Sequence, residues 1–74
     1  MKVQITVFHP EFQTPLLGKV EETDDISKLA REFIMSNLLD EVRTCLLETE
    51  DGSYVVLPDG IVKKCVFKFV NMEE

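Results

Sequence analysis

The chain has 74 residues, of which 45% are hydrophobic, and its 14 acidic side chains outnumber 8 basic ones to give a formal net charge of -6. This length predicts one domain spanning residues 1–74, close to the lower size at which a single hydrophobic core suffices for stability. The negative field favours basic partner surfaces and argues against direct binding to nucleic acid or to anionic lipid.

The first half of the chain predicts a hairpin followed by a helix. Apolar and polar residues alternate over residues 3–7, and this pattern predicts a strand. Two prolines within residues 9–15 predict a loop, and residues 16–22 predict a second strand. Thr23 or Asp24 can then cap a helix, and Asp25 favours its positive end. The helix carries one apolar face and is expected to end between residues 37 and 39; this face contains Ile26, Leu29, Ala30, Phe33 and Ile34.

The second half of the chain predicts three more strands. Residues 42–49 are rich in strand-forming residues, and the Asp51-Gly52 turn joins them to a strand over residues 54–57. Residues 61–64 suit one short helical turn, and residues 65–70 form the last and most apolar strand. The order ββαβββ predicts an α+β fold, with a mixed sheet of four to five strands packed on one helix.

This order of elements resembles the ubiquitin-like β-grasp over the whole chain. The resemblance implies that the last strand returns beside the first. Ubiquitin-like modifiers and sulfur carriers end in a diglycine that is activated as an adenylate, whereas this chain ends in residues 70–74, VNMEE. Conjugation is therefore not expected.

The acidic residues are clustered, and capping explains only Asp24 and Asp25 among them. Seven of the others define an expected partner-binding surface: Glu21, Glu22, Asp40, Glu41, Glu48, Glu50 and Asp51. Glu48 and Glu50 on one strand face would stand about 6.6 Å apart, which is comparable to the step between DNA phosphates. The chain is thus expected to bind a basic protein, as a DNA mimic that blocks a nucleoid or transcription protein. In size and acidity it resembles the small host-takeover proteins of bacteriophages, some of which are DNA mimics.

Alternation also leaves apolar residues on the sheet face away from the helix. Leu46, Tyr54, Val66 and Val70 are assigned to this face. Such a face, or an unprotected edge strand, suits either a homodimer or another protein partner. The alternative function is therefore a β-grasp adaptor or scaffold that binds its partner through this face, with the acidic residues serving solubility.

The sequence contains no motif for catalysis, for a metal or for a cofactor. His9 is the only histidine and is expected to be a solvated loop residue. Cys45 and Cys65 lack a CxxC spacing and are expected to be buried reduced thiols. The chain has neither an apolar leader nor a run of roughly 20 apolar residues. We therefore expect a non-enzymatic cytoplasmic protein that contacts no membrane.

Overall fold

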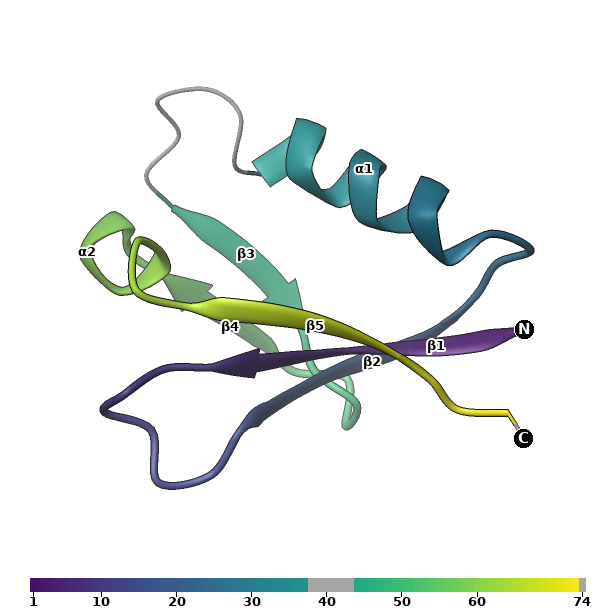
Figure 1. The fold of residues 1–74 in the computed structure, drawn as a ribbon. Coiled ribbons are helices and arrows are strands. Elements are labelled where there is room, and N and C mark those ends of the chain that lie inside the picture. The colour runs from purple at the N-terminus through teal and green to yellow at the C-terminus, as the bar shows by residue number, and fades with distance from the viewer. Residues whose placement is uncertain (38–43, 74) are drawn as a thin grey trace.

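The computed structural model describes residues 1–37 and 44–73, which form an α+β fold (Figure 1). Its elements are β1 (Lys2–Phe8), β2 (Leu16–Glu22), α1 (Ile26–Asn37), β3 (Cys45–Glu48), β4 (Tyr54–Leu57), α2 (Asp59–Val62) and β5 (Val66–Asn71). The α+β class and the order of the strands and helices are confirmed. Within the described residues, no helix is both long and apolar enough to span a bilayer.

The strands form two separate antiparallel sheets. The first has three strands in the order β2-β1-β5, and the second is the hairpin of β3 and β4. The expected mixed sheet of four to five strands is not observed, because every ladder among the described residues is antiparallel. The last connection explains this difference: β5 begins with Val66 opposite Phe8, at the end of β1, and then runs back until Asn71 lies opposite Val3.

The two sheets meet at Gly18. An isolated bridge joins Gly18 to Thr49, and the Glu50 amide donates to the Leu17 carbonyl oxygen at 3.3 Å. β2 contains a bulge here, since its register with β1 shifts by one residue beside Ile5. A Cβ atom at Gly18 would lie 3.0 Å from the Ile5 carbonyl oxygen, which is too close for an unstrained contact. Glycine at position 18 therefore lets β2 lie close to the backbone of β1, at the place where Thr49 of the hairpin bridges to β2.

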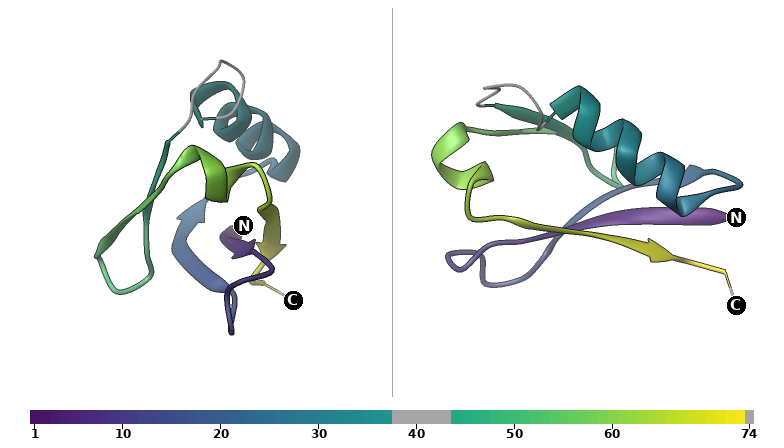
Figure 2. Two further views of the ribbon diagram at one scale, coloured as in Figure 1. Left: turned by 90° about the vertical axis from the view of Figure 1, so that its left-hand side faces the viewer. Right: turned by 45° about the horizontal axis from the view of Figure 1, so that its top comes forward.

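The core lies between the three-stranded sheet, the β3–β4 hairpin and α1, which crosses above them (Figure 2). Its fully buried apolar residues come from β1, β3 and β4: Val3, Ile5, Val7, Cys45, Leu47 and Leu57. α1 contributes Phe33, whose ring centroid lies 5.2 Å from that of Phe67 and 5.7 Å from that of Phe69. These tilted and edge-on contacts hold α1 against β5.

The cap of α1 is Asp25. Its Oδ1 accepts hydrogen bonds from the Ser27 amide at 2.9 Å and from the Lys28 amide at 3.3 Å. Thr23 acts one step earlier, because its Oγ1 accepts from the Asp25 amide at 3.2 Å. The prediction that Thr23 or Asp24 caps the helix is therefore wrong by one or two residues, although the helix begins where the sequence indicated.

Candidate functional site

The contact between β2 and β3 brings two predicted acidic residues into one groove. Glu21 on β2 and Glu48 on β3 line a groove of about 160 Å³, which we call the acidic groove. Its other lining residues are Ile5, Lys19, Phe33, Leu46 and Leu47. Two carboxylates and one ammonium group thus share a space with apolar walls.

Lys19 is the cation of the acidic groove. Its Nζ lies 3.4 Å from Glu48 Oε1, and the two side chains are 51% and 33% exposed. An ion pair with this much solvent contact contributes at most about 1 kcal/mol to stability. Lys19 can therefore leave Glu48 at little cost.

Glu50 lies on the other side of the β2–β3 contact. Its Oε2 accepts from Gln4 Nε2 at 3.1 Å, and the same Gln4 nitrogen donates to the Gly18 carbonyl oxygen at 2.9 Å. Gln4 and Glu21 project from opposite faces of the sheet, since Gln4 pairs with Val20 and Glu21 follows it on β2. β3 ends at Glu48, so the regular strand spacing expected for Glu48 and Glu50 does not apply.

Asp51 holds the turn between β3 and β4. Its Oδ1 accepts from Thr49 Oγ1 at 2.5 Å and from the Ser53 amide at 3.0 Å. The hydrogen bond from Thr49, followed by those from Ser53, lowers the pKa of the Asp51 carboxyl from its usual 3.8. Gly52 follows with a φ of 90°, which confirms the predicted Asp51-Gly52 turn. Asp51 thus has a local structural role in the predicted turn, in which its side chain binds Thr49 and Ser53.

The remaining predicted acidic residues lie away from the groove or are not among the residues that the structure describes. Glu22 stands opposite Lys2 at the far end of β2, and its Oε2 is 3.4 Å from the amino-terminal nitrogen. Asp40 and Glu41 lie outside the described residues. The five members of the predicted acidic set that the structure describes are therefore distributed along both faces of the β2 edge and do not form one row.

The four predicted apolar residues divide between two surfaces. Leu46 and Tyr54 lie on the outer face of the hairpin, where they are 57% and 64% exposed. Val66, which is 63% exposed, and Val70, which is half-buried, lie on the open face of the three-stranded sheet. The prediction of one shared face did not anticipate that the hairpin forms a separate sheet.

His9 is buried, and its prediction as a solvated loop residue is wrong. It is only 7% exposed and its ring lies 5.0 Å from the Phe12 ring, centroid to centroid. Nδ1 accepts from the Glu11 amide at 3.0 Å, so Nε2 carries the proton of the neutral ring. Nε2 is buried and has no hydrogen-bond partner among the described residues. The sequence contains one indication that His9 is buried, which is the apolar Phe12 between Pro10 and Pro15 in the same loop.

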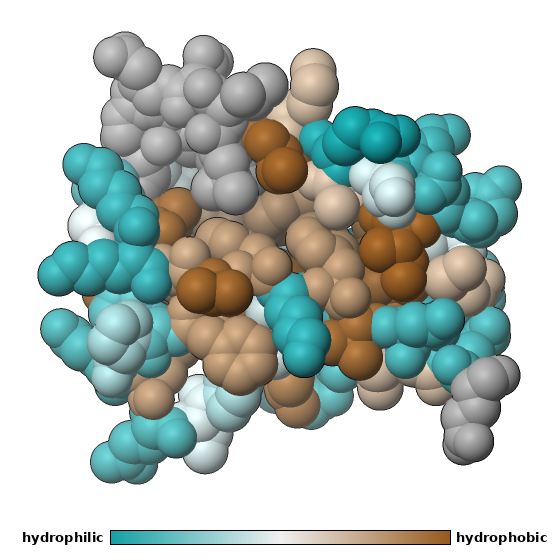
Figure 3. Space-filling model, viewed as in Figure 1, coloured by the Kyte–Doolittle hydropathy of each residue, from teal (hydrophilic) through white to brown (hydrophobic). Residues whose placement is uncertain are grey.

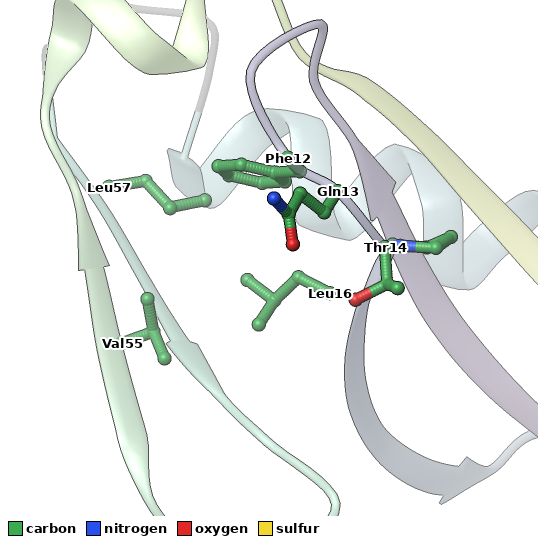
Figure 4. Close-up of a pocket in the computed structure, with 7 residues that line it drawn as sticks. Phe12, Gln13, Thr14, Leu16, Val55 and Leu57 are labelled. Atoms are coloured by element: carbon green, nitrogen blue, oxygen red, sulfur yellow. The ribbon is translucent and has the colours of Figure 1, made fainter.

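The loop after β1 also forms one wall of an apolar cavity that sequence reasoning missed. This cavity has a volume of about 440 Å³ and separates the loop from β4. Figure 4 shows Phe12 and Leu16 on one side, facing Val55 and Leu57 on the other. Its lining suits an apolar side chain, and it holds no ionisable group among the residues that line it.

Both cysteines are free thiols, as predicted, but only Cys45 is buried as expected, whereas Cys65 is half-buried. Burial raises the pKa of the Cys45 thiol, and the nearby Cys65 raises it further. Burial also raises the pKa of the Cys65 thiol. Neither thiol is therefore activated as a nucleophile at neutral pH. In the described parts of the chain, no three His, Cys, Asp or Glu residues are grouped so that they could hold a metal ion.

A scan against protein-family models finds no match to this chain, and searches of curated proteins and of solved structures likewise find none. The function is therefore argued from the chain's own geometry.

Proposed function

We propose that this chain is a non-enzymatic protein that binds a basic surface of a partner protein at the acidic groove. The observation that carries the proposal is the convergence of Glu21 and Glu48, from two different strands, on one groove. A lysine or arginine side chain matches this chemistry, because its aliphatic stem can pack on apolar walls while its charged head meets carboxylates. Lys19 supports the proposal, since its ammonium group already lies beside Glu48.

The partner class we propose is a basic DNA-binding protein of the nucleoid or of transcription. A net charge of -6 on 74 residues steers the chain toward the positive grooves that such proteins present to DNA. The chain would then act as an inhibitor that occupies the DNA-binding surface. The compartment of this activity is the cytoplasm of a cell or of an infected host, where these partners lie.

Competition with DNA tests the proposal. The protein is added to complexes of labelled DNA with a panel of basic nucleoid and transcription proteins, and released DNA is measured in gels at low and high salt. We expect release at low salt and weaker release at high salt, because screening reduces the attraction. An absence of release at low salt from every member of the panel would reject the inhibitor.

A pair of double variants tests the groove itself. Glu21→Gln with Glu48→Gln removes both groove carboxylates, whereas Asp24→Asn with Glu32→Gln removes the same charge from exposed positions elsewhere. We expect the first variant to lose about tenfold or more in apparent affinity, as for a desolvated charge contact. The second variant should lose less affinity, because it changes only the total charge. Equal losses would show that the groove is not the binding site.

The second candidate function is an adaptor or scaffold, of the kind that the β-grasp resemblance implies. The exposure of Leu46 and Val66 favours it, because large apolar side chains that are 57% and 63% exposed suit a protein contact. In this case Val66→Glu, at a position outside the acidic groove, abolishes partner binding, while the groove variant leaves it unchanged. The opposite sensitivities favour the inhibitor.

A further inference from the structure

β5 is a free edge of the three-stranded sheet. It pairs with β1 on one side, and no other strand of the described residues pairs with its outer side. The Met72 amide donates to the Lys2 carbonyl oxygen at 2.7 Å, which fixes the alternation of the β1–β5 ladder. The amide and carbonyl groups of Phe67, Phe69 and Asn71 therefore point away from β1, toward the free edge.

The β5 edge has one of the usual protections against pairing, the charge of Lys68, and lacks the others. Charges, prolines, bulges and very short strands normally prevent edge-to-edge association. β5 contains six residues without proline, it pairs with β1 in an unbroken register, and Lys68 is its one charged residue. At the opposite edge of the sheet, β2 has the bulge beside Gly18 and the bridge to Thr49. Of the two edges of the three-stranded sheet, β5 is thus better suited to accept another strand, and it is longer than the four-residue strand β4.

Apolar side chains surround this edge. Val66 is 63% exposed, Met72 is 49% exposed, and Phe67, Phe69 and Val70 are half-buried. Figure 3, in the view of Figure 1, shows apolar side chains gathered around β5 and below α1. A strand added here would cover them as well as pair with the backbone.

We propose that β5 pairs antiparallel with β5 of a second copy, which gives a continuous sheet in the order β2-β1-β5-β5-β1-β2. The charges at the ends of β5 identify this occupant. Exposed Lys63 and Lys64 precede the strand, and exposed Glu73 follows it. A two-fold axis places the basic start of each β5 beside the acidic end of the other, so opposite charges meet at both ends.

The side chains also select a register. A register with Lys68 opposite Lys68 would place like charges together, which is destabilising. A shift by one residue in each copy instead places Phe69 opposite Phe69 and exposed Val66 opposite exposed Met72. Glu73 then lies beside the Lys64 end of the other copy. Two negative proteins can approach here because Lys63, Lys64 and Lys68 make this the basic part of the surface.

The dimer goes beyond the proposed function and leaves the acidic groove free. β5 and β2 are at opposite edges of the three-stranded sheet, and the acidic groove lies at the β2 edge. The dimer would therefore present one acidic groove at each end of its six-stranded sheet. Failure of the dimer and failure of the groove are separate results, because Glu21→Gln with Glu48→Gln leaves β5 unchanged.

Sedimentation equilibrium of charge-reversal variants, at protein concentrations from micromolar to millimolar, tests the dimer. We expect reversible dimers of the unmodified chain, and about tenfold weaker dimers for Lys64→Glu or Glu73→Lys alone, because each turns two attractions into repulsions. The double variant keeps the net charge of -6 and should restore dimerisation. Both changes are at exposed positions, so folding is preserved.

Amide hydrogen exchange supplies a second readout on the unmodified chain. The amides of Phe67, Phe69 and Asn71 should gain protection from exchange as the protein concentration rises. The amides of β4 that point away from β3 should not gain protection. A monomer at every concentration would overturn the proposal. Dimers whose affinity is unchanged by Lys64→Glu alone and by Glu73→Lys alone would also overturn it. They would indicate association through another face, such as that of Leu46 and Tyr54.

Discussion

Gly18 is the residue through which the hairpin reaches the three-stranded sheet. An alanine there would place its Cβ 3.0 Å from the Ile5 carbonyl oxygen and 3.5 Å from Leu47 Cδ1. The first contact is with the backbone of the central strand, which cannot move without disturbing both of its neighbours. We expect Gly18→Ala to lower the free energy of unfolding by about 1–3 kcal/mol, the usual cost of overpacking.

Urea denaturation measures this effect, and Gly60 is the matched control. A Cβ atom at Gly60 would meet no atom within 4 Å, and Gly60 lies in α2 without a positive φ. Gly60→Ala should therefore be neutral or stabilising by up to about 1 kcal/mol. Equal destabilisation by the two alanines would contradict the importance of the Gly18 contact.

Asp51 gives the stability a dependence on pH. Hydrogen bonds from Thr49 and Ser53 lower the pKa of its carboxyl from the usual 3.8 in the folded state. Between the two pKa values, the unfolded state binds more protons than the folded state. The stabilisation that the Asp51 carboxylate provides is therefore complete above the usual pKa, and it is lost as the pH falls through the lower pKa of the folded state. We expect Thr49→Val to raise the pKa of Asp51 toward 3.8 and to reduce the loss of stability in acid. Carboxyl NMR titration checks the pKa; an unchanged midpoint would contradict the role of the hydroxyl.

At the scale of the elements, local patterns predicted most of the secondary structure. Alternation and turn chemistry placed β1, β2 and the Asp51-Gly52 turn, because these signals act within a few residues. The direction of β5 could not be predicted, since it depends on where α2 returns the chain relative to the end of β1. The acidic groove could not be predicted either, because Glu21 and Glu48 come from different strands and share a groove where β3 lies beside β2, near the Gly18–Thr49 bridge.

The cap of α1 is a prediction at the same scale. Asp24 and Asp25 have the same side chain, but it is Asp25 whose Oδ1 accepts from the Ser27 and Lys28 amides. We expect Asp25→Ala to cost about 1 kcal/mol, because two amides of the first turn lose their acceptor. Asp24→Ala should cost clearly less in the same urea experiment. The reverse order would show that the cap is misassigned.

At the scale of the whole molecule, the net charge is expected to oppose folding and to favour the proposed binding. A net charge of -6 repels itself in the compact state, and salt screens this repulsion. The same screening weakens attraction to a basic partner. Folding and binding should therefore respond to salt in opposite directions, which separates general electrostatics from the specific acidic groove.

Thermal unfolding at low protein concentration, where the chain is monomeric, measures the first response. We expect added salt to raise the Tm by about 4–8 °C if it restores about 1 kcal/mol to a chain of this length. The groove variant, Glu21→Gln with Glu48→Gln, and its exposed control, Asp24→Asn with Glu32→Gln, remove equal charge. Both should reduce this gain, whereas only the groove variant should lose binding. A Tm that falls with salt would show instead that ion pairs such as Lys19 with Glu48 outweigh the self-repulsion.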